Sequence, residues 1–310
     1  MKQFAIILSI PVALILGYFA LSHFSSEKYS ANDFNKAQAI EGVVESVPSE
    51  ISVEVEKEPE FVVTHIKTPE AVKALYMTSW VASTPSIAKK VIDVVDATEA
   101  NALVIDIKDY TGNISFQSGD PRLVEYGSEV NRIKNIKEFI GELHKKNIYV
   151  IGRVAVFQDP HLVKERPDLA VKTSSNKNAI WKDRKGITWL DAGSEEVWEY
   201  AVLVGEVSYA MGFDEINYDY IRFPSDGNMK DIYYPVSDGK SKPEVLKGFF
   251  SYLNDTIRQK GIPISADLFG MVTTNTDDLN IGHVLENTLP YVDFVAPMVY
   301  PSHFPPTWNG

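Results

Sequence analysis

Six short apolar runs, rich in β-branched residues, alternate with amphipathic helical stretches from about residue 72 to the end of the 310-residue chain. This rhythm constrains the fold most, because it is typical of repeated βα units around a parallel sheet. We expect strands at 74–79, 102–107, 148–156, 215–220, 262–268 and 292–299. We expect helices from Pro85 onward, at 131–146, at 194–211, from a capping box at Ser241 to 261, and at 281–289.

Six βα units are compatible with a doubly wound sheet or with a barrel. No glycine-rich phosphate turn follows the first strand, which argues against a nucleotide-binding sheet. We therefore expect an α/β fold, a (β/α)8 barrel of TIM type, over residues 71–310. A complete barrel of this type has eight strands, so we expect this one to be truncated after about six.

An uncharged, mostly apolar segment occupies residues 4–21, shortly after Lys2. Eighteen residues reach about 27 Å as a helix, close to the hydrocarbon thickness of a bilayer. We expect residues 1–24 to be a signal anchor, a single transmembrane helix that leaves the rest of the chain outside the cytoplasmic membrane. The alternative is a cleaved signal peptide and a secreted protein. Residues 25–70 are expected to form an acidic, flexible linker, because seven glutamates and only one lysine, Lys57, lie between 41 and 60.

The composition excludes several classes of function. A net charge of −12 cannot neutralise a run of phosphates, so no nucleic-acid partner is expected. The chain has no cysteine, which excludes disulfides, thiolate metal sites and cysteine nucleophiles. A serine-hydrolase elbow and metalloenzyme ligand spacing are also lacking, so we expect no cofactor and no metal, and no obligate protein partner is evident.

Active sites of βα barrels lie at the carboxyl ends of the strands. In this chain, polar and aromatic residues gather at those ends. They are Trp80, Asp106, Lys108, Asp109, Arg153, Asn217, Asp219, Arg222, Asp267, Tyr300 and His303. A metal site built from Asp106, Asp109 and His303 can be imagined, but no ligand spacing supports it. Asp109 could instead cap a helix.

Asp219 is the strongest single candidate. Alternation along its strand puts Asn217 and Asp219 on the side that faces the barrel interior, and Asp267 stands at the same level on the next strand. Two carboxylates that face one cleft are the minimum equipment for glycoside hydrolysis. Arg153 or Arg222 could pair with Asp219, and the alternative to catalysis is an ion pair that shapes the barrel mouth.

Two connections are much longer than usual βα loops. Residues 157–193 contain Trp181 and Trp189, and residues 222–240 contain Tyr233 and Tyr234. Exposed aromatic rings over a polar site would bind sugars by stacking, whereas the alternative is that these rings pack within their own loops. His144 and His161 are interpreted as ordinary surface residues.

Six segments resemble, in order, the family of glycoside-hydrolase type long filed as domain of unknown function 4015. They are VIDIKD (104–109), the Arg153 strand with FQDP (157–160), WLD (189–191), FDEINYDYIRFP (213–224), SADLFG (265–270) and APMVYPSH (296–303). The resemblance implies a TIM barrel distantly related to α-amylase-type enzymes and an activity on glycans.

By the same resemblance Asp219 is the nucleophile, Asp267 stands where such relatives have a glutamate as acid, and Asp191 supports the site. A chitinase-type catalytic glutamate would fall at Ile221, which excludes that chemistry. The family's last strands are expected after His303.

Together these observations predict a membrane-tethered, extracytoplasmic glycosidase that acts on a polysaccharide or oligosaccharide. Asp219 would act as nucleophile or base and Asp267 as acid, while Arg153 and Arg222 would hold the carboxylates ionised. The sugar-binding site would be lined by Trp80, Tyr300 and His303. Asp106, Lys108, Asp109, Asp191 and Asn217 would occupy supporting positions. The rival hypotheses are a barrel that binds glycans without cleaving them and, more weakly, a metal-dependent hydrolase.

Overall fold

The computed structural model describes residues 61–303. The predicted anchor (1–24) and most of the predicted linker (25–70) lie outside the described residues. Within residues 61–303, no helix combines the length and the apolar character needed to cross a bilayer.

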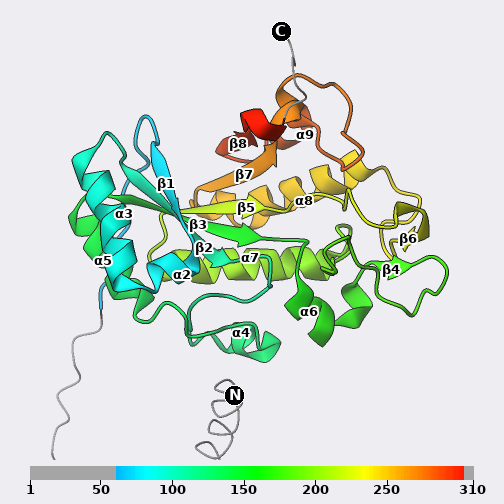
Figure 1. The fold of residues 1–310 in the computed structure, drawn as a ribbon, viewed down its shortest axis with the longest axis horizontal. Helices are drawn as coiled ribbons and strands as arrows, with labels where there is room; N and C mark the ends of the chain where they lie inside the picture. Colours follow the sequence, from blue (N-terminus) through cyan, green and yellow to red (C-terminus); the bar gives the residue numbers. More distant parts are fainter. Residues whose placement is uncertain (1–60, 304–310) are drawn as a thin grey trace, which may run out of the picture. The chain divides into compact units, whose positions relative to one another are not determined.

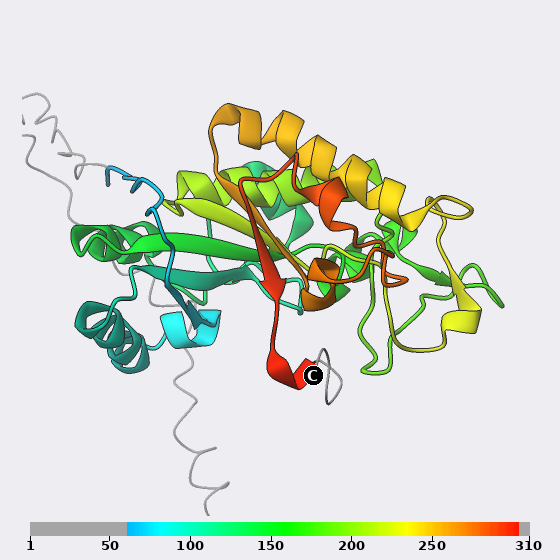
Figure 2. The same cartoon turned by 90° about the horizontal axis from the view of Figure 1, so that it is seen from above.

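The central element is a curled sheet of six parallel strands (Figures 1 and 2). These strands are β1 (Ala74–Met77), β2 (Ala102–Lys108), β3 (Tyr149–Ala155), β5 (Glu215–Asp219), β7 (Ile264–Phe269) and β8 (Phe294–Met298). Their order is β1-β2-β3-β5-β7-β8, so each strand of the series lies beside the next. All six predicted strands are confirmed, each boundary within two residues. In the described part of the chain, β1 and β8 form the two edges, and the sheet is an open, half-barrel-like arrangement.

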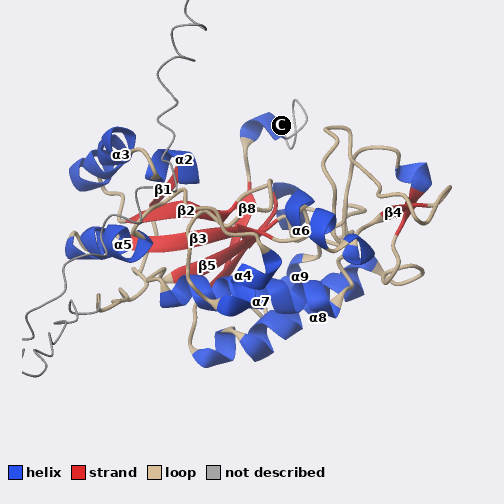
Figure 3. Ribbon diagram, turned by 90° about the horizontal axis from the view of Figure 1, so that it is seen from below, coloured by secondary structure: helices blue, strands red, loops and turns tan. Residues whose placement is uncertain are grey.

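The helices lie mainly along one face of this sheet (Figure 3). They are α2 (Ser79–Ala82), α3 (Pro85–Ala97), α4 (Pro121–Tyr126), α5 (Ile136–Lys145), α6 (Pro160–Glu165), α7 (Glu195–Ala210), α8 (Lys242–Thr256) and α9 (Leu285–Thr288). Single 3-10 turns occupy Pro167–Leu169, Met229–Asp231, Arg258–Lys260, Gly270–Thr273 and Pro301–His303.

Several predicted helix ends are wrong for identifiable reasons. The helix expected at 131–146 begins only at Ile136, because Ile133 donates its backbone N–H to Ser115 and Asn135 has a positive φ of 52°. Ser241 occupies the N-cap of α8, but its side chain makes no capping hydrogen bond, so the predicted capping box is not formed. The helix expected at 281–289 is reduced to one turn in α9.

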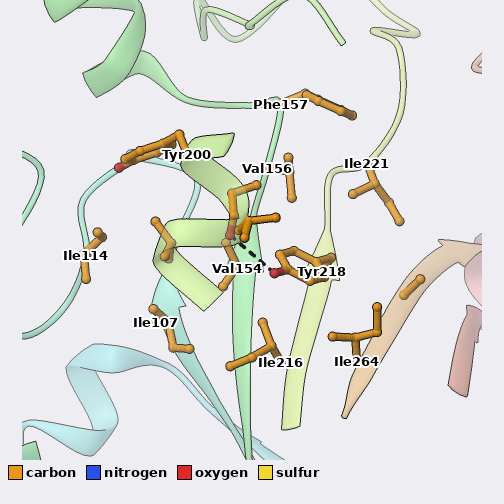
Figure 4. Close-up of a cluster of buried hydrophobic side chains, with 14 of the residues drawn as sticks. Ile107, Ile114, Val154, Val156, Phe157, Tyr200, Ile216, Tyr218, Ile221 and Ile264 are labelled. Carbon is orange, nitrogen blue, oxygen red and sulfur yellow. Dashed lines mark hydrogen bonds between the residues drawn. The ribbon is translucent and has the colours of Figure 1, made fainter. Parts of the chain in front are cut away.

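The helix-facing side of the sheet forms the apolar core (Figure 4). Ile107, Val154, Ile216 and Ile264 alternate with inward polar residues along their strands and are fully buried. Tyr218 also points to this side and donates its hydroxyl to the Ala201 carbonyl of α7 at 3.3 Å. The polar residues Arg153, Asn217 and Ser265, which follow or precede these positions, therefore project from the opposite face.

The long connections after β3 and β5 form one unit. They pair through a small antiparallel sheet of β4 (Lys172–Thr173) and β6 (Ile232–Tyr233). Trp181 and Trp189 are 2% and 0% exposed inside this unit, so the expectation that they present open sugar-binding faces is wrong. Burying two large rings is a sufficient reason for their presence, because it gives these long loops an apolar core.

Residues 61–70, the end of the predicted linker, lie against the domain. The Ile66 backbone N–H donates to Asp214 at 2.6 Å, and Thr64 hydrogen-bonds His144 at 2.9 Å. His144 also contacts Asp214 at 3.0 Å and has only 6% side-chain exposure, so its interpretation as a surface residue is wrong. A buried carboxylate with several donors fixes this segment to the amino-terminal end of β5.

Candidate active site

Asp219 and Asp267 lie side by side on the open face of the sheet. β5 and β7 pair in parallel up to Tyr218 and Ala266, so the two aspartates follow at the same level. Neighbouring strands are about 4.8 Å apart, which brings the two side chains within reach of each other. Their side chains are 9% and 17% exposed.

The Arg153 guanidinium joins three carboxylates. It forms ion pairs with Asp219 through Nη2 and with Asp106 through Nη1, the latter at 2.9 Å. Its Nε lies 3.7 Å from Asp267. Burial opposes the charge of Arg153, but Asp219 and Asp106 raise its pKa above the ordinary value. One permanent cation therefore orients and partly neutralises the acidic cluster.

The two aspartates have different surroundings. Burial and the neighbouring Asp219 carboxylate raise the pKa of Asp267 to about 7, against the opposing effects of Asn217 and Arg153. Asp219, by contrast, accepts the short Arg153 ion pair and a hydrogen bond of 2.5 Å from the Tyr220 backbone N–H. Two donors thus hold the Asp219 carboxylate in place beside an acid, Asp267, that keeps its proton near neutrality.

The carboxylates open into connected cavities. A cavity of about 660 Å³ runs along the open face and is lined by Arg153, Asn217, Asp219, Asp267 and other residues. A smaller cavity of about 180 Å³ shares Arg153, Asp219 and Asp267 with it and continues to Arg222. Both cavities therefore give access to the two carboxyl groups from the open face of the sheet.

A family model described as "Putative glycosyl hydrolase domain" matches residues 74–310. The chain belongs to this family. The resemblance predicted from the six sequence segments is therefore confirmed, and it extends over the whole described sheet.

Solved structures add further similarities to this glycosyl hydrolase family member. A hypothetical protein from Ruminiclostridium thermocellum is 34% identical, with a TM-score of 0.57 over 62% of this chain and 96% of that chain. An α-galactosidase from Thermus thermophilus is 15% identical, with a TM-score of 0.45 over 74% of this chain and 42% of that chain. A chitobiase from Flavobacterium johnsoniae is 12% identical, with a TM-score of 0.47 over 73% and 38%. The search of curated proteins found no match.

Within the family fold, five predicted site residues meet at one place. Asp106, Arg153, Asn217, Asp219 and Asp267 form a continuous set of contacts, because Asn217 donates to Asp267 at 3.1 Å while Arg153 joins the three aspartates. Burial raises the pKa of Asp106. Tyr300, which is 55% exposed, lines the larger cavity.

Lys108 lies elsewhere, and the prediction that it supports the substrate site is wrong. A register shift between Asp106 and Lys108 pairs Lys108 with Val154, whose side chain faces the helices. Lys108 is consequently 1% exposed and forms an ion pair with buried Asp159 at 2.7 Å. One extra residue in the strand has moved its side chain to the opposite face.

Trp80 and Asp109 form a separate cluster around Arg132. The Arg132 guanidinium lies 4.2 Å from the Trp80 ring centroid and 3.2 Å from Asp109. Asp109 also accepts the Thr111 backbone N–H within a turn and caps no helix. Trp80 and Asp109 do not line the two cavities that contain Asp219, so their role at the substrate stays a prediction.

Asp191 is a buried residue that joins the two long loops. It accepts the backbone N–H groups of Val236 at 2.7 Å and of Ser237 at 3.1 Å. Its expected role at the sugar is corrected accordingly, since the side chain is 0% exposed. His303 belongs to the 3-10 turn Pro301–His303, and its side chain lies outside the described part.

Arg222 reaches the site but does not pair with either catalytic candidate. It lines the smaller cavity together with Asp219 and Asp267, and among the described residues no carboxylate oxygen lies within 4.0 Å of its guanidinium nitrogens. The ion pairs with Asp219 and Asp267 are formed by Arg153 and not by Arg222, which corrects the predicted pairing of Arg222 with these carboxylates.

Sequence reasoning missed several residues of the site. Tyr76 donates its hydroxyl to Asp106 at 2.6 Å, and Glu215 lines the large cavity. Glu215 lies two residues before Asn217, so strand alternation puts both side chains on the same face. The same alternation along the first strand could have identified Tyr76. His283 gave no such signal: it lines the smaller cavity, its two ring nitrogens bond backbone groups of Ile221 and Phe269, and burial lowers its pKa to about 4.

Among residues 61–303, no group of three or more His, Asp or Glu side chains is arranged to hold a metal ion. What the observed arrangement offers is acid–base and nucleophilic chemistry by paired carboxylates.

Proposed function

We propose that this protein is a glycoside hydrolase that cleaves a polysaccharide or oligosaccharide with Asp219 as nucleophile and Asp267 as general acid and base. The observation that carries this proposal is the different surroundings of two adjacent carboxyl groups. Asp219 is held by Arg153 and a backbone N–H, whereas Asp267 has its pKa raised to about 7 by burial and by Asp219. Glycoside hydrolysis by a carboxyl pair requires one group that donates a proton and a second that acts as a carboxylate.

We further propose that the reaction retains the anomeric configuration. Inverting enzymes separate their carboxyl groups by about 6.5–9.5 Å so that a water fits between them, whereas retaining enzymes use about 5–5.5 Å. Asp219 and Asp267 follow paired positions on adjacent strands and contact one guanidinium, and Asp219 raises the pKa of Asp267. This closeness supports direct attack by a carboxylate on the sugar.

In the first step an Asp219 oxygen forms a bond to the anomeric carbon as the bond to the leaving oxygen breaks. Asp267 gives its proton to that leaving oxygen, which departs as an alcohol. In the second step Asp267, now ionised, takes a proton from water. The resulting hydroxyl group bonds to the anomeric carbon and releases Asp219 as a carboxylate.

The proposed location is outside the cytoplasmic membrane, with residues 1–24 as the anchor. The support is the uncharged apolar segment 4–21 after a single lysine. Fractionation of cells that express the full chain tests this. Membrane-bound protein whose domain is digested by added protease is expected, whereas protection of the domain in intact cells would contradict the orientation.

The catalytic proposal is tested with Asp219→Asn and Asp267→Asn in the full chain. The screen uses aryl glycosides and polysaccharides with reducing-sugar detection, and Asp255→Asn on the exposed surface of α8 is the control. Asp267→Asn should lower kcat about 10²–10⁴-fold for natural glycans and much less for a dinitrophenyl glycoside, which needs no proton. Asp219→Asn should abolish turnover while glycan affinity persists.

The stereochemistry is followed by NMR of the first-formed sugar. A product with the opposite anomeric configuration would refute the nucleophile role of Asp219. If the parent protein binds a glycan but releases no reducing sugar from any member of the screen, the hydrolase assignment fails in favour of a non-catalytic glycan-binding barrel.

A further inference from the structure

Arg222 is a half-buried cation without an acidic partner. Every other half-buried arginine of residues 61–303 lies within ion-pair distance of a carboxylate. These are Arg132, Arg153, Arg166 and Arg258. Arg222 donates only from Nη1, to the Phe223 carbonyl at 3.1 Å and the Ser225 hydroxyl at 3.3 Å. Its Nε and Nη2 have no hydrogen-bond acceptor among the described residues.

Aromatic rings hold this guanidinium in place. Its central carbon lies 4.8 Å from the Trp189 ring centroid, 5.2 Å from that of Phe269 and 6.0 Å from that of Tyr220. Cation–π attraction offsets part of the cost of burying a charge. It is not enough, because burial still lowers the pKa of Arg222 below its usual range. The fold therefore orients a positive charge and leaves part of its hydrogen-bonding capacity unused.

Arg222 borders the space where a sugar would bind. Arg222 lines the cavity of about 180 Å³ that also contains Asp219 and Asp267. It also lines a neighbouring cavity of about 620 Å³ with Gln158, Asp183 and other residues of the long loops. The guanidinium thus stands between the reacting carboxyl groups and the outer pocket.

We propose that Arg222 binds an anionic group of the substrate, and that the substrate is an acidic glycan with a carboxylate on the sugar next to the scissile bond. The inference rests on the proposed hydrolase function and names its substrate class. A planar guanidinium with two free N–H directions matches a carboxylate in a bidentate geometry. Asp183 and Asp226 line the outer pocket and disfavour a doubly charged phosphate more than a singly charged carboxylate.

The test compares one polymer in two forms. Uronic-acid polysaccharides of the polygalacturonate, hyaluronan and alginate types are offered to the full chain, each beside its carboxyl-reduced neutral counterpart. Sulfated neutral galactans and phosphorylated glycans form the third set. We expect kcat/KM for an acidic polymer to exceed that for its reduced counterpart about 10–100-fold, the range of a charged hydrogen-bonded pair.

Two variants connect this preference to Arg222. Arg222→Gln should remove the preference for the acidic polymer over its reduced counterpart. Arg222→Lys should retain part of this preference, because lysine keeps the positive charge but cannot bind a carboxylate in the bidentate geometry. Arg122→Gln is the matched control, since Arg122 is exposed and pairs only with Asp120. Circular dichroism and urea unfolding establish that each variant is folded.

The outcomes separate this inference from the proposed function. Turnover of neutral glycans at rates equal to acidic ones, or an undiminished preference in Arg222→Gln, overturns the acidic-substrate inference and leaves the hydrolase intact. A preference for sulfated or phosphorylated glycans overturns the assignment of the bound anionic group as a carboxylate. If no glycan is cleaved, calorimetric titration with uronic-acid oligosaccharides decides: binding that Arg222→Gln weakens about 10–100-fold upholds the anion site without hydrolysis, and no binding overturns both.

Discussion

The raised pKa of Asp267 has a direct consequence for the stability of the fold. An aspartate that holds its proton up to pH of about 7 in the folded state, against about 4 in the unfolded chain, makes the folded state bind more protons between these values. The free energy of unfolding must then decrease as pH rises through this window. A difference of about 3 pH units, at about 1.4 kcal/mol each, sets an upper limit of about 4 kcal/mol.

Asp267→Asn removes this penalty. The amide keeps an oxygen for the bond from Asn217 and cannot ionise, so the variant should unfold at a higher urea concentration than the parent at pH 8. At pH 4 the two proteins should be nearly equal, because Asp267 is protonated in the parent. The gain at pH 8 should be a few kcal/mol, bounded by the limit above.

The assay is urea denaturation of the full chain, followed by tryptophan fluorescence from pH 4 to pH 8.5. Asp255→Asn, on the exposed side of α8, is the control. Its urea midpoint should differ from that of the parent by the same amount at pH 4 and at pH 8.5. The reasoning is refuted if the parent and Asp267→Asn lose stability in parallel as pH rises, since Asp267 would then be ionised in the folded state at low pH.

Further measurements examine other parts of the molecule. The kcat/KM of the parent should decline above pH of about 7, where Asp267 loses the proton it donates; a flat alkaline profile would contradict its role as acid. Arg153→Lys should lower kcat about 10–100-fold in steady-state assays, because one ammonium cannot reach three carboxylates. Gly205→Ala should destabilise the fold by about 1–3 kcal/mol in urea, because the added carbon would lie 2.4 Å from the Tyr218 hydroxyl; an unchanged midpoint would contradict the tight contact of α7 with β5. Asp214→Asn should lower the free energy of unfolding by about 3–5 kcal/mol at pH 7. Burial raises the pKa of Asp214, but its hydrogen bonds outweigh this effect and lower it, so the contribution of Asp214 should begin to decrease as pH falls below about 4 and be lost as pH passes its lower folded-state pKa; a difference between the two proteins that does not decrease below pH 4 would contradict this.

The parallel strands were predictable because buried strands leave a strong apolar signal. The sequence placed the sheet strands within two residues, and alternation correctly put Asn217 and Asp219 on one face. The same rule failed at Lys108, two positions after Asp106, because a register shift interrupts the alternation. A bulge depends on the neighbouring strand, and the residues of β2 alone do not specify it.

The loops were less predictable, for a different reason. The aromatic content of 157–193 was visible, but burial of Trp181 and Trp189 depends on contacts with the loop after β5. Likewise, Asp191 resembles a site residue in the sequence, whereas its oxygens are occupied by Val236 and Ser237, some 45 positions away. Pairings between distant loops have no periodic pattern to reveal them.

The joining of these two loops bears on how the specificity of such a protein can change. Arg222 lies in the loop that follows Asp219, the last residue of β5. The loop after β3 supplies Trp189, on which the Arg222 guanidinium packs. Since the β4–β6 ladder and Asp191 tie both loops together, an insertion in one would displace the wall contributed by the other. New substrates would therefore be acquired through matched changes in both segments, and exchanging one loop between relatives without the other should impair folding before it alters sugar preference.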